Sequence, residues 1–220
     1  MPKRPVTIAE LPRLVPLFPL SGALLLPYAR RPLNVFEPRY VEMVDDALSG
    51  DRLIGLIQPE DTTVESPLGR APLQKIGCLG RLVHFEESDD RYFIILEGLT
   101  RFELAAEPEV MTPYRQGAID ASRFALDFAH GHGEEAVDRP RFLKMMRDYA
   151  EFGNFDLNWK EIEDTSTADL VNFCCMVSPY GAAEKQLLLE AESLEQRAEA
   201  LIAMAEYEMA REGGRPAPLN

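Results

Sequence analysis

The segment from Leu14 to Tyr40, LVPLFPLSGALLLPYARRPLNVFEPRY, constrains the fold of this chain more than any other part. It is too apolar for a solvated loop, and its prolines fix φ and remove backbone donors, so no helix can run through it. Prolines are tolerated in strands at edges, starts and bulges, which favours a small, irregular, closed or half-closed sheet. The extended pieces expected between the prolines cover residues 14–20, 24–26 and 33–36.

The pattern changes from extended to helical at Pro38. Proline suits the first turn of a helix, because the backbone N–H groups there have no acceptor within the helix and the one that proline lacks is not missed. Val41, Val44 and Leu48 then recur at helical spacing, and Gly50 follows as a stop signal. The sequence therefore predicts a helix over residues 38–49.

Beyond this helix, β-rich runs continue to about residue 124. A short apolar run at 53–57 precedes a polar stretch at 60–75, which predicts a long loop. Residues 77–85 and 91–99 form a predicted hairpin, with a turn whose acidic side chains are expected to be solvated. Further strands are expected at 102–106 and 114–124.

After Ala129 the apolar residues recur with a helical period, following a flexible connector at 130–135. Ser166-x-x-Asp169 and Ser193-x-x-Gln196 are patterns of helix N-termini. The predicted organisation is a β subdomain at 1–125, a linker at 126–137, a helical subdomain at 138–213 and a frayed tail at 214–220.

Several motifs follow one another in the β-rich part: PLFPL at 16–20, PLNVFEPRY at 32–40, RLIG at 52–55, IGCLGRL at 76–82 and YFIILEGLTRF at 92–102. In this order they resemble the N-terminal domain of Lon protease. The resemblance covers residues 12–125 and, more loosely, the helical remainder. It implies an α+β fold, with a PUA-like twisted β barrel that carries one helix, followed by a C-terminal helical bundle subdomain.

The same resemblance implies the substrate-engaging part of an ATP-dependent protease. A complete Lon protease needs a phosphate-binding G-x-x-x-x-G-K-[ST] loop and a Ser-Lys dyad, and neither pattern is found in these 220 residues. We therefore expect a stand-alone, non-enzymatic module that binds unfolded or partner polypeptides through exposed apolar surface and sheet edges. A small hydrolase or peptidase-related enzyme and a PUA-like RNA-binding module are the alternatives.

Charge and cysteine content bear on the partners and the compartment. The formal net charge of −14 argues against nucleic acid and anionic membranes, and no stacking aromatics are interleaved with the basic pair Arg30-Arg31. No apolar run reaches the roughly 18 residues of a membrane span, and prolines interrupt any signal-peptide core. The three cysteines predict free thiols, so we expect a cytoplasmic protein and leave a homo-oligomer open. They are Cys78, Cys174 and Cys175.

Candidate groups for chemistry are few. His130-x-His132 with Glu134 has the residue types of a metal site, but the flanking glycines favour a solvated loop. His84 lies in a strand-like run, and we interpret it as structural because no nucleophile is paired with it. We therefore assign no catalytic, cofactor-binding or metal-binding residue and expect no cofactor.

Charged residues inside the apolar motifs must be paired if they are buried. We therefore expect Arg101 and Glu37 to lie close together, partly buried, with Arg39 either joining them or pairing nearby. The binding site is expected in a cleft between the subdomains, with PLFPL and the loop at 61–72 near its rim. An exposed apolar patch is expected within residues 14–36, and burial of this surface in the barrel or in a homodimer is the alternative.

Overall fold

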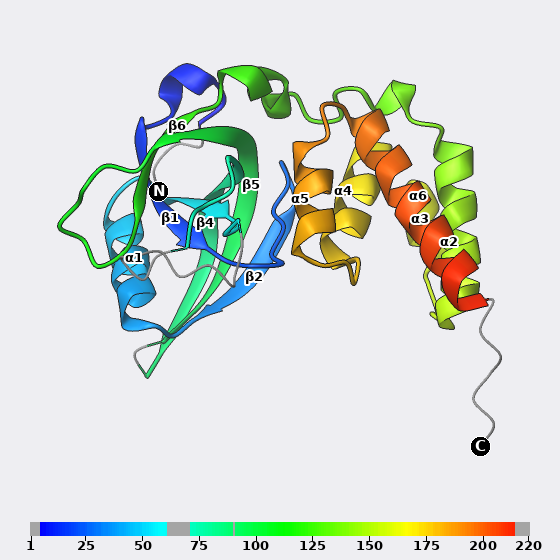
Figure 1. The fold of residues 1–220 in the computed structure, drawn as a ribbon, viewed down its shortest axis with the longest axis horizontal. Coiled ribbons are helices and arrows are strands. Elements are labelled where there is room, and N and C mark those ends of the chain that lie inside the picture. Colours follow the sequence, from blue (N-terminus) through cyan, green and yellow to red (C-terminus); the bar gives the residue numbers. More distant parts are fainter. Residues whose placement is uncertain (1–4, 61–70, 90, 214–220) are drawn as a thin grey trace. The chain divides into compact units, whose positions relative to one another are not determined.

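The computed structural model describes residues 5–60, 71–89 and 91–213 and contains two compact units (Figure 1). We name them the sheet unit, Met1–His130 with Met176–Glu190, and the helical unit, Gly131–Cys175 with Ala191–Asn220. The boundary between them falls inside helix α4 (Thr167–Val177). The predicted tail at 214–220 and most of the loop predicted at 60–75 lie outside the described residues.

Six strands form one mixed sheet in the order β2-β5-β4-β3-β1-β6, and an additional β5–β6 pairing closes it on itself. β1 and β3 run parallel, whereas every other pairing in the described sheet is antiparallel. The strands are β1 (Leu14–Pro19), β2 (Arg30–Val35), β3 (Leu53–Ile57), β4 (Ile76–Ser88), β5 (Arg91–Ala106) and β6 (Gln116–Asp120).

The core of the sheet unit is built largely from the proline-rich segment. Val15, Leu17 and Leu24 are at most 1% exposed, and burying each such side chain stabilises the fold by about 1.5–3 kcal/mol. Helix α1 (Pro38–Ser49) has the bounds that the sequence predicts. Its buried residues are Tyr40, Met43, Val44 and Ala47.

The predicted strand at 24–26 is wrong, because these residues form a buried loop instead. The loop passes so close to β5 that a Cβ on Gly98 would lie 2.1 Å from the carbonyl oxygen of Leu26. Only a glycine permits this approach. Because Gly98 has no side chain, the apolar run at 24–26 can lie buried against β5 without pairing as a strand. The predicted strands at 91–99 and 102–106 are one strand, β5, while the run at 114–124 gives only the short β6.

Helix α5 (Ala182–Glu190) belongs to the sheet unit, so the expectation of one helical subdomain over 138–213 is wrong. The reason is a buried polar network. Gln58 at the end of β3 accepts a hydrogen bond from Gly22 N (2.8 Å) and donates to the Ala182 carbonyl and to Gln186 Oε1 (both 3.0 Å). Gln186 in turn donates to the Ile76 carbonyl (3.1 Å), at the start of β4.

The predicted linker at 126–137 is not an extended connector. It contains the end of a 3-10 segment, η2 (Ser122–Phe128), and a second one, η3 (Glu134–Ala136). Asp127 forms an ion pair with Arg101 of β5, and Glu134 accepts a hydrogen bond from Ala168 N at 3.3 Å in the helical unit. Each half of this segment is therefore held by its own unit, which the local glycines did not indicate.

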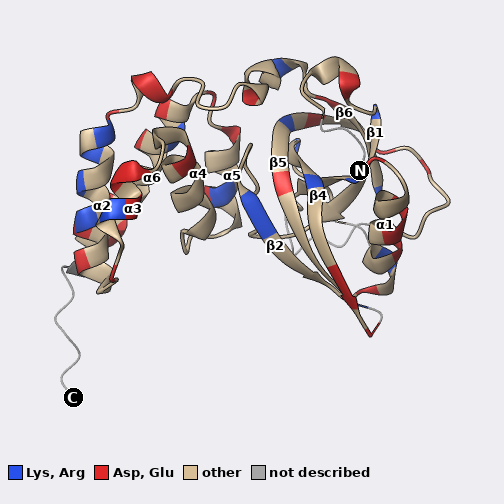
Figure 2. Cartoon of the chain, turned by 180° about the vertical axis from the view of Figure 1, so that it is seen from behind, with Lys and Arg blue, Asp and Glu red and all other residues tan. Residues whose placement is uncertain are grey.

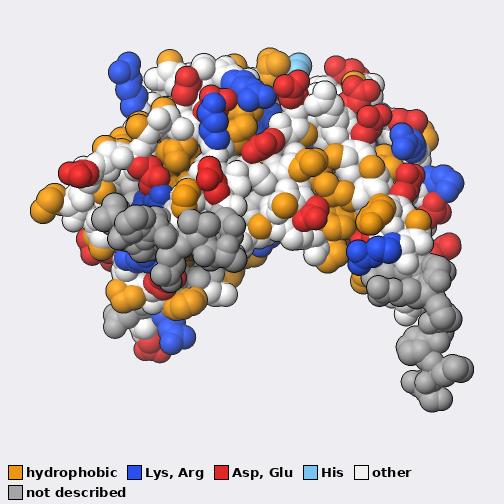
Figure 3. All heavy atoms as spheres, in the orientation of Figure 1, with side chains coloured by type: hydrophobic (Ala, Val, Ile, Leu, Met, Phe, Trp, Pro, Cys, Tyr) orange, Lys and Arg blue, Asp and Glu red, His pale blue; other side chains and the backbone are white. Residues whose placement is uncertain are grey.

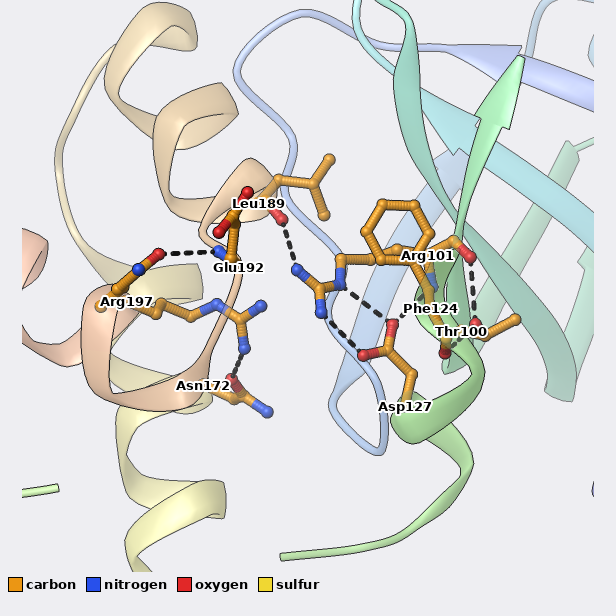
Figure 4. A network of polar contacts seen from close by, with 9 residues as sticks. Thr100, Arg101, Phe124, Asp127, Asn172, Leu189, Glu192 and Arg197 are labelled. Atoms are coloured by element: carbon orange, nitrogen blue, oxygen red, sulfur yellow. Dashed lines mark hydrogen bonds and ion pairs between the residues drawn. The ribbon is translucent and has the colours of Figure 1, made fainter. Parts of the chain in front are cut away.

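The helical unit contains α2 (Arg139–Gly153), α3 (Trp159–Asp164), most of α4 and α6 (Leu194–Gly213). Both predicted N-terminal caps are confirmed, since Asp169 N donates to Ser166 Oγ and Gln196 N donates to Ser193 Oγ, each at 3.1 Å. In the interior of this unit, Arg197 donates to Asn172 Oδ1 at 2.9 Å (Figure 4).

Candidate functional site

β2 is an edge strand in a sheet that is otherwise closed. It pairs with β5 along its whole length, and in the described part of the chain no strand pairs with its other edge. β2 begins with the basic pair Arg30-Arg31, whereas the end of the β4–β5 hairpin and α1 carry acidic side chains (Figure 2). An open edge presents unpaired backbone donors and acceptors, which another extended chain can use.

The register identifies the backbone groups that face this open edge. Gly98 of β5 donates to the Ala29 carbonyl and accepts from Tyr28 N (both 2.9 Å), so its backbone points toward the β2 side. Backbone direction alternates along a strand, so Leu96, Ile94 and Tyr92 point the same way. Their partners Arg31, Leu33 and Val35 therefore direct their backbone N–H and C=O groups toward β5, which leaves none for the open edge.

The intervening residues Arg30, Pro32 and Asn34 direct their backbone groups to the open edge. Proline fits there, because it has no N–H to give to the ladder. The edge thus offers three carbonyl oxygens and the N–H groups of Arg30 and Asn34. Pro32 removes the donor between them, which limits the edge to weak pairing.

The side chains beside this edge are partly apolar and accessible. Phe36, directly after β2, is 64% exposed, and Phe85 of β4 is 40% exposed. Phe93 and Ile95 of β5 are half-buried on the face that they share with Pro32 and Asn34. A bound extended segment would therefore find apolar contacts as well as backbone partners.

The sequence prediction of an Arg101–Glu37 pair is wrong. Arg101 binds Asp127 through Nε and Nη2, at 3.0 and 2.8 Å, and its Nη1 donates to the Leu189 carbonyl at 3.2 Å (Figure 4). Glu37 instead pairs with Arg39 at 2.6 Å on the surface, where both side chains are about half exposed. Arg101, the charged residue inside the apolar motif, is paired as expected, but its partner Asp127 lies in the segment predicted as a linker.

The histidines do not come together. His84 Nε2 lies 3.0 Å from Glu86 Oε1 at an exposed position of β4, and the ring of His130 packs 4.6 Å from that of Tyr28. His132 is exposed, and Glu134 binds Ala168 N. Among the residues that the structure describes, no three His, Cys, Asp or Glu side chains are grouped to hold a metal ion.

The expected apolar patch within residues 14–36 is wrong. Of its large apolar side chains, Leu14 (43%) and Phe36 (64%) are exposed, while nearly all the others form the core. The barrel interior buries more apolar side chains than one face of an open sheet would, because the loop at 24–26 packs inside it together with the strands. The predicted cleft between subdomains stays a prediction.

The sequence predicted binding at sheet edges but did not identify β2 as the edge strand, although Pro32 is the signal that could have done so. A proline inside a strand favours an edge position.

The charges on the face shown in Figure 3 are interspersed, with basic and acidic side chains side by side. No helix in the described part of the chain is long and apolar enough to cross a membrane.

The sequence matches a known protein family. A family model described as the ATP-dependent protease La (LON) substrate-binding domain matches residues 14–206. The chain belongs to this family. Among LON relatives, the Lon protease of Parabacteroides distasonis is 28% identical over 192 residues, covering 86% of this chain and 23% of that protein. The Lon protease of Desulfosudis oleivorans is 32% identical over 96 residues, 43% of this chain and 12% of that protein.

Solved LON structures share the fold. The Lon N-terminal domain protein from Xanthomonas campestris aligns with a TM-score of 0.61 at 19% identity, covering 86% of this chain and 97% of that one. The N-terminal domain of a Mycobacterium avium complex Lon protease gives 0.64 at 14% identity, with 88% and 98% covered. The chain therefore spans nearly all of each LON N-terminal structure, and less than a quarter of the two full-length relatives.

Proposed function

We propose that this chain binds polypeptide segments in an extended conformation, and that the open edge of β2 takes them up as an added strand. The proposal is supported by the family description, which is that of a substrate-binding domain. The single observation that carries it is the unpaired edge of β2 in an otherwise closed sheet.

Strand addition fits what the edge offers. Backbone hydrogen bonds to Arg30 and Asn34 are independent of the bound sequence, and the apolar side chains nearby add contact without demanding one residue type. The missing donor at Pro32 keeps each encounter weak. Weak, sequence-tolerant binding suits a module that must release many different segments.

We further propose that the chain acts by binding rather than by turnover, and that its closed sheet, together with α1, is a PUA-like barrel. The family description supports the first point, and the β5–β6 closure supports the second. A cytoplasmic location stays a prediction of the sequence. The test must distinguish RNA binding from polypeptide binding, because the β2 edge begins with the basic pair Arg30-Arg31.

Three variants test the edge through its backbone. Asn34→Pro removes an edge donor without touching a β5 hydrogen bond, so we expect weaker binding of a labelled unfolded protein in fluorescence anisotropy. Pro32→Val adds a donor and should strengthen binding. Asn34→Ala keeps the N–H and is the matched control, expected to bind like the parent chain.

The same titration with labelled RNA, at two salt concentrations, separates polypeptide binding from RNA binding. Phosphate contacts weaken steeply with salt, whereas backbone pairing and apolar contact mostly survive it. Salt-sensitive RNA binding without polypeptide binding would refute the proposal. So would equal polypeptide affinities of the proline variants and the parent, once circular dichroism shows that all of them are folded.

A further inference from the structure

We propose that two exposed phenylalanine rings at the C-terminal end of α2, together with the carboxylates next to them, bind an arginine side chain of another polypeptide. The rings are those of Phe152 and Phe155, and we name them the aromatic platform. The platform lies within the helical unit. The inference therefore goes beyond the proposed function and does not depend on strand addition at β2.

The end of α2 fixes the platform in position. Asn154 follows the helix in the left-handed conformation, at φ +53°, and the next residue, Phe155, donates its backbone N–H to the Ala150 carbonyl at 2.9 Å. The chain is thereby turned back, and the ring of Phe155 fills the space in which a side chain on Gly153 would stand. A ring that is already in place loses little freedom when a ligand binds.

Tyr149 supports the platform from one side. Its ring centroid lies 6.3 Å from that of Phe155 and 6.1 Å from that of Phe152. Its hydroxyl donates to Glu208 Oε2 at 3.0 Å, near the end of α6, which runs beside α2 (Figure 1). Phe152 is nevertheless 38% exposed and Phe155 57% exposed, so both rings can be reached from solvent.

The charge around the platform is negative. Residues 148–156 carry three carboxylates and no basic side chain. Asp148 is paired with Lys144 at 2.6 Å. Glu151 and Asp156, each next to a platform ring in the chain, are exposed, and in the described structure their carboxylates have no hydrogen-bond or ion-pair partner. A cation at the platform would therefore meet two carboxylates that can still accept.

The same protein shows elsewhere what completes such a group. Arg147 places its Cζ 5.1 Å from the ring centroid of Trp159, while its Nη2 lies 3.3 Å from Glu163 Oε1. Arg101 in the same way lies 4.6 Å from the ring of Phe124 and binds Asp127. In each case one guanidinium stacks on a ring and pairs with a carboxylate, which are the two interactions that arginine combines best.

The platform offers the ring and the carboxylates without the guanidinium. Within residues 5–60, 71–89 and 91–213, every cation that lies over a ring is an arginine, and none lies over Phe152 or Phe155. Arginine from a partner would supply the missing group. Its charge complements the surface, and its planar head fits a flat ring.

Charge also decides against other occupants. A second copy of this chain would bring the same carboxylates against their own kind, and nucleic acid or an anionic membrane would be repelled. An uncharged apolar segment could cover the rings, but it would remove water from Glu151 and Asp156 without offering them a partner. A polypeptide segment that contains arginine satisfies both parts of the surface.

The test uses three capped heptapeptides that differ only at the central residue, which is arginine, citrulline or norleucine. Citrulline has nearly the shape of arginine without its charge. The peptides are titrated into the isotope-labelled chain at low ionic strength, and amide shifts are followed by NMR. We expect the arginine peptide to shift the amides of residues 151–156 saturably. It should bind about tenfold more tightly than the citrulline peptide, because it adds one exposed cation–ring contact and exposed ion pairs.

Variants assign the binding to the platform. Phe155→Leu keeps an apolar side chain on Gly153 but removes the ring, and should weaken the arginine peptide about two- to fivefold. The double variant Glu151→Gln, Asp156→Asn should weaken it about fivefold. The matched control is Glu195→Gln, Glu199→Gln. It removes two exposed charges near the start of α6, away from the platform, and should leave affinity unchanged.

Four results would overturn the inference: equal affinity for the citrulline peptide, equal or tighter binding of the norleucine peptide, unchanged affinity in both platform variants, or an equal loss in the α6 control. Concentration-dependent shifts of residues 151–156 without any peptide would also overturn it, because they would assign the platform to a second copy. Peptide shifts at residues 30–35 that Asn34→Pro abolishes would assign the peptide to the β2 edge instead. Failure of strand addition alone would leave the arginine-dependent shifts intact, so the two proposals fail separately.

Discussion

Arg101 and Asp127 form a buried, two-pronged ion pair, with the Arg101 side chain 7% exposed and that of Asp127 10% exposed. The backbone N–H of Arg101 also donates to Asp127 Oδ2, at 2.9 Å. The pair thus joins β5 to η2, and the third arm of the guanidinium reaches the end of α5. Three segments that are distant in the sequence meet on one side chain.

Arg101→Met should lower the free energy of unfolding by about 3–5 kcal/mol, because it leaves the Asp127 carboxylate buried without a partner. Urea unfolding followed by circular dichroism measures this. Arg39→Met is the matched control, since it breaks the exposed pair with Glu37 and should cost less than about 1 kcal/mol. A loss at Arg101 as small as that at Arg39 would contradict the buried pairing.

Gln58→Leu should destabilise the chain by about 1–3 kcal/mol, because Gly22 N and the Ala182 carbonyl lose a buried partner. Gln186→Leu should have a similar effect. The double variant should cost less than the sum of the two, since each single change already breaks the bond between the amides. Full additivity in the denaturation midpoints would argue that the two glutamines act independently.

Gly98→Ala should prevent folding or cost more than about 3 kcal/mol, because the new Cβ meets the backbone of Leu26 rather than a movable side chain. Gly22→Ala is the comparison. Gly22 has φ +71°, and no atom lies within 4 Å of the place that its methyl group would take, so only the left-handed conformation opposes alanine, at about 1–2 kcal/mol. Thermal unfolding of both variants measures the contrast, and equal shifts would contradict it.

The folded chain should lose stability as the pH rises from 10 toward 12. The hydrogen bond that Tyr92 donates to Asp45, at 2.6 Å, is the main cause that raises the pKa of Tyr92 from 10.0 to about 12. In this window the unfolded chain releases the phenolic proton while the folded chain keeps it, so the contribution is complete below pH 10 and is lost on the way to pH 12.

Asp45→Asn should lower the pKa of Tyr92, which the ultraviolet absorbance of tyrosinate reports during an alkaline titration. Asp156→Asn, at an exposed carboxylate of the helical unit, is the control and should leave that titration unchanged. If the two variants titrate alike, the hydrogen bond to Asp45 does not hold the proton.

Local signals in the sequence predicted the elements whose shape is decided locally. Pro38 and Gly50 bound α1, short apolar runs indicated β3 and the β4–β5 hairpin, and two serine caps indicated the starts of α4 and α6. Each of these depends on residues within a few positions of one another.

Features decided by distant partners could not be predicted in this way. Whether Leu24–Leu26 pairs as a strand or fills the core depends on Gly98, more than 70 residues away in the chain. Likewise, the ion pair of Arg101 depends on Asp127, and the place of α5 in the sheet unit depends on Gln58.

The placement of Met176–Glu190 in the sheet unit has a consequence for synthesis on the ribosome. The barrel segments are complete at His130, yet Gln58 and Arg101 find their last partners only in α5, about 60 residues later. At about 5–20 residues per second, the nascent sheet must wait several seconds with these groups unsatisfied. During that interval water or other partners occupy the polar groups of Gln58 and Arg101 that face α5, so the sheet unit reaches its final form only after α5 has been synthesised.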